Sequence, residues 1–142
     1  MENQNYKNHK KMVTGFHYIG GVLMLLILIG SIVNLVVSSS DNRYSASLIV
    51  GLTILSFIIF YYVRAFALKA QDRAIRAEEN FRHYLLAGKP FSKDLKMRQI
   101  IGLRFASDDE FLELAKRAVS ETLSEDDIKK SIKNWKSDTN RL

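Results

Sequence analysis

Two long apolar stretches dominate the first half of the chain, and a highly charged sequence follows them. The first stretch covers residues 13–37 and the second covers residues 45–68, with the polar connection SSSDNRY between them. Each has about 20 consecutive, mainly apolar residues, the helical length needed to cross about 30 Å of hydrocarbon. The pattern predicts an all-α protein that begins with a transmembrane helical hairpin. We place the hairpin at 13–68, its spans at about 14–37 and 45–67, and its outer loop at 38–44.

The first apolar stretch has two other interpretations. It could be a buried core helix of a soluble protein, but a second stretch of similar length so close by disfavours this. It could be the apolar region of a cleaved signal peptide, because Lys7, Lys10 and Lys11 precede it and small serines follow it. Such regions are about 7–15 residues long, which is shorter than this stretch. Two membrane spans are therefore the better interpretation.

Small and polar residues predict how the two spans pack together. Lipid provides no hydrophobic drive between helices, so contacts within a membrane favour small residues. The candidates for helix packing are Gly20 and Gly30 in the first span and Ser47 and Gly51 in the second. Asn34 is a polar residue near the outer end of the first span. It could belong to a transport path, or it could form an interhelical hydrogen bond, which is the interpretation we favour.

The second span continues into a charged helix without a visible break. Gly51 is the last helix breaker before Gly88 and Pro90. A glycine just after the last turn, with a proline shortly beyond it, is typical of a helix end. We therefore predict a stalk helix at 69–88 that prolongs the second span.

A narrow seam of mostly small residues runs along the predicted stalk. We define the seam by four residues at steps of three and four, namely Ala70, Ala74, Ala77 and Phe81. Such a heptad-like stripe favours close approach by another helix. The charges around it predict the i,i+4 pairs Asp72 with Arg76 and Glu78 with Arg82, each with the acid first. Much of the charge is thus interpreted as a solvated helix face.

Basic residues set the predicted orientation. They are frequent before the first span and after the second, whereas the connection carries Arg43 beside Asp41. The positive-inside rule therefore places both termini in the cytoplasm. Attraction to anionic lipid decays within about a Debye length. We therefore assign lipid head-group contact to Arg64 and Lys69, the basic residues nearest the membrane.

The remaining parts are a cytoplasmic N-terminal tail at 1–12 and a small helical cytoplasmic head at 89–142 with about three short helices. Their predicted starts are Ser92, Ser107 with Glu110 as a capping box, and Ser124 with Leu123 and Ile128 as a hydrophobic staple. Their apolar faces consist of Phe111, Leu112, Ala115, Ala118, Val119, Ile128, Ile132 and Trp135. A segment of this size buries little surface. We expect it to pack on the stalk, on another copy or on a partner.

Composition disfavours several classes of function. The chain has no cysteine, which excludes disulfides and thiolate metal sites. Its net charge is +6, but basic and acidic residues are mixed in the distal segment, so we predict no nucleic-acid binding. The acidic runs SDDE and SEDD stand where helix starts favour acids. We find no acid–base cluster and no phosphate loop, and we predict no enzymatic activity, no metal and no cofactor.

Four blocks of sequence carry a resemblance to a known family. They are NYKNHK near the start, RAFALKAQDRAIRAEENFRHYLLAGK, QIIGLRFASDDEF and IKKSIKNWKSD. Together they resemble a family of uncharacterised small bacterial membrane proteins with two transmembrane spans and a helical cytoplasmic C-terminal region. The resemblance covers nearly the whole chain. It implies a multi-pass protein of the bacterial inner membrane and adds no site residues.

Two functional hypotheses follow. The leading one is a non-enzymatic scaffold or accessory subunit, whose hairpin fixes it in the membrane and whose stalk presents the head to a protein partner or to another copy. The alternative is a transport or channel component whose path forms between subunits of an oligomer, with Asn34 and the span glycines at the interface. The predicted partners are membrane lipid and either a second copy or another protein.

Overall fold

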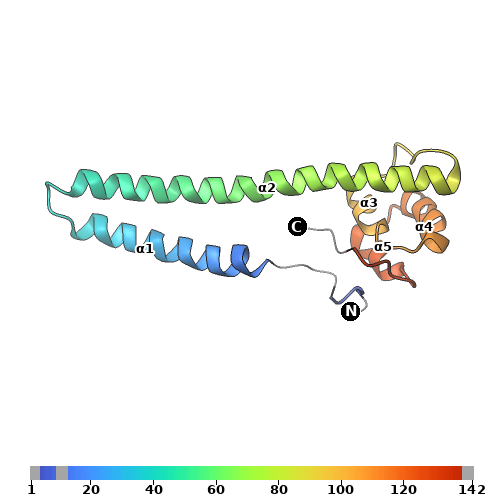
Figure 1. Ribbon diagram of the computed structural model, residues 1–142, viewed down its shortest axis with the longest axis horizontal. Helices are drawn as coiled ribbons and strands as arrows, with labels where there is room; N and C mark the ends of the chain where they lie inside the picture. Colours follow the sequence, from blue (N-terminus) through green and yellow to red (C-terminus); the bar gives the residue numbers. More distant parts are fainter. Residues whose placement is uncertain (1–3, 9–12, 139–142) are drawn as a thin grey trace. The chain divides into compact units, whose positions relative to one another are not determined.

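The computed structural model describes residues 4–8 and 13–138, and in these residues the chain is helical with no strand. The elements in chain order are a π-helical segment η1 (Gly15–Gly20), α1 (Gly21–Val37), α2 (Arg43–Ala87), α3 (Met97–Leu103), α4 (Asp108–Ser120) and α5 (Glu125–Ser131) (Figure 1). The predicted all-α class, with two long apolar helices followed by shorter ones, is confirmed. Lys10 and Lys11, which contribute to the predicted orientation, lie outside the described residues.

The chain divides into two compact units. Residues 12–67 form the first, which we call the apolar unit. Residues 1–11 together with residues 68–142 form the second, which we call the C-terminal unit. The segments that the sequence suggested as tail, stalk and head thus belong to one unit.

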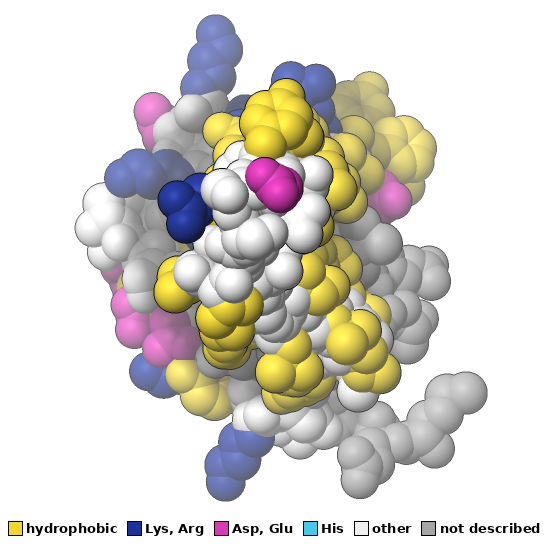
Figure 2. Space-filling view, turned by 90° about the vertical axis from the view of Figure 1, so that its left-hand side faces the viewer, with side chains coloured by type: hydrophobic (Ala, Val, Ile, Leu, Met, Phe, Trp, Pro, Cys, Tyr) yellow, Lys and Arg dark blue, Asp and Glu magenta, His cyan; other side chains and the backbone are white. Residues whose placement is uncertain are grey.

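The apolar unit consists of η1, α1 and the first part of α2, which lie antiparallel about the connection at 38–42 (Figure 1). By length and composition, Gly15–Val37 and Arg43–Ala87 could each cross a membrane. In an apolar 18-residue stretch of each, 6% and 11% of the residues are buried, so neither stretch is enclosed as a core helix would be. Figure 2 views this unit from its connection, and hydrophobic side chains line the outside of its helices.

Helix α2 is uninterrupted over its 45 residues. It ends where the sequence predicts, because Gly88 has a φ of 69°, in the left-handed region that glycine adopts without strain. The Gly88 N–H donates to the Tyr84 carbonyl at 2.8 Å and closes the last turn.

One hydrophobic core holds the C-terminal unit together. Helices α3, α4 and α5 gather against the last turns of α2 (Figure 1). The largest fully buried side chains are Phe105, Phe111, Ile100, Leu103 and Ile128. Ile75 of α2 belongs to the same core. The predicted apolar faces of α4 and α5 are confirmed. The head was expected to pack on the stalk, on another copy or on a partner, and within this chain it packs on the stalk.

The predicted start of α3 at Ser92 is wrong. The Asp94 N–H bonds to the Ser92 hydroxyl at 3.3 Å, so this serine closes a local turn. The helix begins only at Met97. There the Gln99 side chain accepts the N–H of Lys96 at 2.9 Å and satisfies a backbone donor of the first turn.

The predicted capping box at the start of α4 is also wrong. The Ser107 hydroxyl is buried and has no hydrogen-bond partner within the described residues. The Glu110 carboxylate instead accepts the backbone N–H groups of Lys133 and Asn134, at 3.1 and 2.9 Å. Glu110 therefore ties α4 to the segment that follows α5.

The predicted start of α5 is confirmed. The Ser124 hydroxyl accepts the N–H of Asp127 at 3.2 Å, and the Asp127 carboxylate interacts in turn with the N–H of Ser124. Leu123 and Ile128 both pack in the core, as a hydrophobic staple requires.

Candidate functional site

The hairpin uses one of its predicted packing glycines. A Cβ on Gly20 would meet the Phe60 ring at 3.2 Å, so the two helices approach closely there. A Cβ on Gly30 or Gly51 would meet nothing within 4 Å, and Ser47 is exposed. These three residues stand on helix faces that are turned away from the contact within this hairpin, and their role in helix packing stays a prediction.

Other small residues are buried in the apolar unit. They are Ser31, Ala46 and Thr53. The hydroxyls of Ser31 and Thr53 donate to carbonyls of their own helices, both at 2.8 Å, so they need no partner across the contact. Phe16 stacks on Phe60 with ring centroids 4.0 Å apart. The one-heptad spacing of Ala46 and Thr53 is the sequence signal that could have identified this face.

Asn34 does not form the interhelical hydrogen bond that the sequence favoured. Its side chain is exposed and makes no hydrogen bond within the described part of the chain. Its backbone carbonyl accepts the Ser38 hydroxyl at 2.6 Å, in the last turn of α1. Asn34 therefore lies beside the polar connection.

The seam of α2 is exposed in the C-terminal unit. Its three alanines are exposed, and Phe81 is 63% exposed. Ile75, on the opposite side of α2, is 7% exposed and enters the core. The head thus packs on the face opposite the seam, and the seam remains uncovered.

Arg82 joins α2 to the rest of the C-terminal unit. Its side chain is 11% exposed. Its guanidinium donates to Asp108 at 2.7 Å, to Glu79 at 3.0 Å and to the carbonyl of Ala106 at 2.7 Å. It also lies 4.1 Å from the centre of the Phe111 ring. This largely enclosed cation forms the polar contact between α2 and the start of α4.

The ion pairs predicted for the stalk are not formed. Arg82 pairs with Glu79 in place of Glu78. Asp72 and Arg76 form no ion pair with any described residue. Exposed i,i+4 pairs are worth only a few tenths of a kcal/mol, so the enclosed acceptors of the head determine the position of Arg82.

The N-terminal segment contacts the C-terminal unit. The Tyr6 hydroxyl donates to Asp126 at 2.6 Å, and the Lys130 ammonium lies 5.6 Å from the centre of the Tyr6 ring. The bond to Asp126 raises the pKa of Tyr6, whereas hydrogen bonds from Lys130 and Tyr6 lower the pKa of Asp126. The Asp138 N–H donates to the Gln4 side chain at 2.8 Å. Residues 4–8 are therefore held against α5 and the segment after it.

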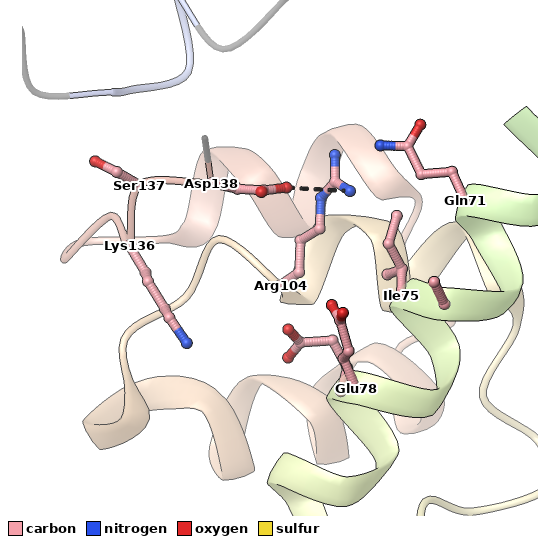
Figure 3. Close-up of a pocket in the computed structure, with 9 residues that line it drawn as sticks. Gln71, Ile75, Glu78, Arg104, Lys136, Ser137 and Asp138 are labelled. Atoms are coloured by element: carbon pink, nitrogen blue, oxygen red, sulfur yellow. Dashed lines mark ion pairs between the residues drawn. The ribbon is translucent and has the colours of Figure 1, made fainter. Parts of the chain in front are cut away.

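A polar cavity of about 290 Å³ opens beside α2. Glu78, Arg104 and Lys136 reach it from three different segments of the chain (Figure 3). Arg104 pairs with Asp138 at 3.2 Å. The two signs of charge are mixed here, so the cavity favours no single sign of ligand charge.

A larger groove of about 680 Å³ lies between the end of α2 and α4. Its walls include Phe91, Leu112 and Val119, with Lys89 and Lys116 also in the lining. The groove is predominantly apolar. Within residues 4–8 and 13–138, no group of three or more histidine, cysteine, aspartate or glutamate side chains is placed to hold a metal ion.

The sequence model of a family of unknown function, DUF6526, matches residues 1–142. The chain belongs to this family. No curated protein and no solved structure matches it significantly. Membership of DUF6526 confirms the resemblance to an uncharacterised family and assigns a role to none of the residues above.

Proposed function

We propose that this DUF6526 protein is a membrane-anchored helical scaffold or accessory subunit. Its apolar unit spans the membrane as a hairpin, and the resemblance of its sequence blocks implies a bacterial inner membrane. Its C-terminal unit presents the seam to a helix of a protein partner or of a second copy. The main support for the proposal is that the seam is exposed. The hydrophobic core of the C-terminal unit packs on the opposite face of α2.

The exposed side chains of the apolar unit support the membrane part of the proposal. The residues that are about half exposed or more include Val22, Leu25, Ile29, Val36, Leu52, Ile54 and Ile59. Burying one such side chain fully is worth about 1.5–3 kcal/mol. Water is therefore an unfavourable solvent for this unit, and hydrocarbon is a favourable one.

The contact of residues 4–8 with the C-terminal unit supports an even number of spans. Segments that touch lie on the same side of a membrane, and a two-span hairpin returns the chain to the side where it began. The basic residues outside the hairpin, including Lys7, favour the cytoplasm as that side. In this arrangement Arg64 and Lys69 stand closest to the lipid head groups.

Topology is tested with single cysteines, which the natural chain lacks. A Ser39→Cys variant is expected to react with a membrane-impermeant maleimide on intact cells. A Ser137→Cys variant is expected to react only after the cells are permeabilised. Reaction of Ser137→Cys on intact cells would exclude a cytoplasmic C-terminal unit, and failure of both after permeabilisation would exclude an accessible connection.

The seam is tested by replacing Phe81 with a photoreactive phenylalanine analogue of similar size. Light is expected to crosslink it in native membranes, giving twice the chain's mass for a second copy or another discrete mass for a partner. Adding Ala74→Phe should overpack the close contact, which typically costs about 1–3 kcal/mol. The crosslinked yield should therefore fall about 5- to 150-fold at limiting concentration.

Glu113→Phe is the matched control for the seam, because it adds an exposed phenylalanine to α4 away from α2. It is expected to leave the crosslink unchanged. Equal yields from Ala74→Phe and the unsubstituted seam would remove close helix packing as the basis of the proposal.

A further inference from the structure

A second groove on the C-terminal unit is basic. It lies where α2 meets the turn at residues 91–95, on the other side of that turn from the apolar groove, and has a volume of about 360 Å³. Arg73 and Arg76 line it from α2, and Lys93 lines it from the turn. None of its lining residues is acidic.

The three cations have no salt-bridge partner within the described residues. None of Arg73, Arg76 and Lys93 forms an ion pair with a described residue, and all three are exposed. Other arginines of the unit do have acidic partners, including Arg98 with Glu125 at 3.2 Å. Like charges three residues apart on a helix repel each other. An anion in the groove would relieve this repulsion.

The groove has a fixed frame. The Asn80 side-chain oxygen accepts the backbone N–H of Phe91 at 2.8 Å and ties the turn to α2. Leu95, 3% exposed, and Ile100, 1% exposed, anchor the other end of the turn in the core. The backbones that carry the three cations are therefore held in place before any ligand arrives.

The donors of the groove match a phosphate group. Each guanidinium presents a planar fork of N–H groups that can engage two oxygens at once, and the ammonium of Lys93 adds a point charge. Because the oxygen of the Asn80 amide is already used as an acceptor, its nitrogen is left as a further donor. A carboxylate has two oxygens for these donors, whereas a phosphate ester presents more oxygens and up to two charges.

We propose that the groove formed by Arg73, Arg76 and Lys93 binds phosphate-bearing anions. This chemistry is shared by the head groups of anionic phospholipids and by free phosphate esters. The groove lies wholly within the C-terminal unit, so the proposal does not depend on the hairpin crossing a membrane.

Binding is tested by calorimetry on the full-length protein in micelles of a neutral detergent. Two probes distinguish the sources, namely inorganic pyrophosphate and dihexanoyl phosphatidylglycerol below its micellar concentration. Dihexanoyl phosphatidylcholine is the neutral reference. Saturable binding of pyrophosphate alone would assign the groove to free phosphates. Binding of the glycerol lipid in excess of the choline lipid would assign it to a lipid head group.

The variant Arg73→Gln/Arg76→Gln/Lys93→Gln is expected to weaken binding at least tenfold. The control Lys89→Gln/Lys116→Gln/Lys133→Gln removes the same charge from exposed positions elsewhere on the unit and is expected to change affinity less than twofold. If both triple variants lose equal affinity, the binding is nonspecific attraction to a basic protein and the site is excluded. If neither pyrophosphate nor the glycerol lipid binds, the proposed site is excluded as well. Lys93→Glu alone, in the turn and outside every helix, provides a second variant if the triple substitution disturbs α2.

Discussion

Replacing Phe111 with alanine is expected to lower the free energy of unfolding of the C-terminal unit by about 3–5 kcal/mol, the usual cost of removing a buried phenylalanine side chain. Phe111 is fully buried. Its ring centre lies 5.9 Å from that of Phe91 and 6.2 Å from that of His83, and Arg82 stacks on its face. One side chain thus joins α4, the turn after α2, and α2 itself.

Hydrogen exchange of the full-length protein in detergent micelles measures this effect. Amides in the middle of α4 should exchange at least about a hundredfold faster in Phe111→Ala, since about 1.4 kcal/mol corresponds to a factor of ten. Phe81→Ala is the matched control, because Phe81 is 63% exposed on the same unit. It should leave exchange in α4 nearly unchanged. Similar acceleration by both substitutions would mean that Phe111 does not hold α4 in place.

The lengths of the long helices could be predicted because local chemistry determines them. No glycine or proline interrupts α2 between Gly51 and Gly88, and nothing in the chain overrides that continuity. The end of the helix at Gly88 is equally local, since it needs only a residue that tolerates positive φ. In the same way Ser124 and Asp127 satisfy each other within one turn.

The face of α2 that packs on the head could not be predicted in this way. Ile75 is the only large apolar residue between Leu68 and Phe81 and produces no stripe, whereas the seam produces a clear one. Periodicity shows where apolar surface lies but not which segment covers it. The buried face is completed by Arg82, whose stem and guanidinium pack on Phe111. Its partners, such as Asp108, are distant in sequence.

The local capping rule also failed where a side chain bonds to a segment that is distant in sequence. A capping box at Ser107 would satisfy one or two donors of α4 and is worth about 1 kcal/mol. Glu110 instead accepts one hydrogen bond from each of the two backbone N–H groups of residues 133–134. Hydrogen bonds to a charged carboxylate are stronger than those between neutral groups. Glu110 thus bonds to a segment that is distant in sequence, and a single sequence contains no signal of it.

Replacing Arg82 with methionine is the second substitution with a large expected effect. It keeps most of the packing volume and removes the charge. Glu79, whose side chain is 12% exposed, then loses its counter-ion, and the carbonyl of Ala106 loses its donor. Removing one partner of an enclosed ion pair typically costs about 3–5 kcal/mol, because the remaining charge is left without compensation.

Fluorescence of the one tryptophan of the chain provides the measurement. The Trp135 ring is tilted against the buried Phe105 ring, with ring centres 5.2 Å apart, so its emission reports unfolding of the C-terminal unit. In a urea titration of the full-length protein in micelles, Arg82→Met should move the midpoint strongly to lower urea. Arg117→Met is the control, because Arg117 and its partner Glu121 are 44% and 46% exposed, and such surface pairs are worth about 0–1 kcal/mol.

Comparing Arg82→Met with Arg117→Met separates the effect of burial from the effect of charge. Both arginines form bonds of nearly equal length to a carboxylate, 2.7 Å from Arg82 to Asp108 and 2.9 Å from Arg117 to Glu121. Bond geometry alone would therefore predict equal losses. If Arg82→Met costs several times more, the difference comes from the burial of Arg82 and of its neighbour Glu79. Equal midpoints for the two variants would mean that Arg82 is as dispensable as a surface charge, and that apolar packing through Ile75 and Phe111 alone holds the head on α2.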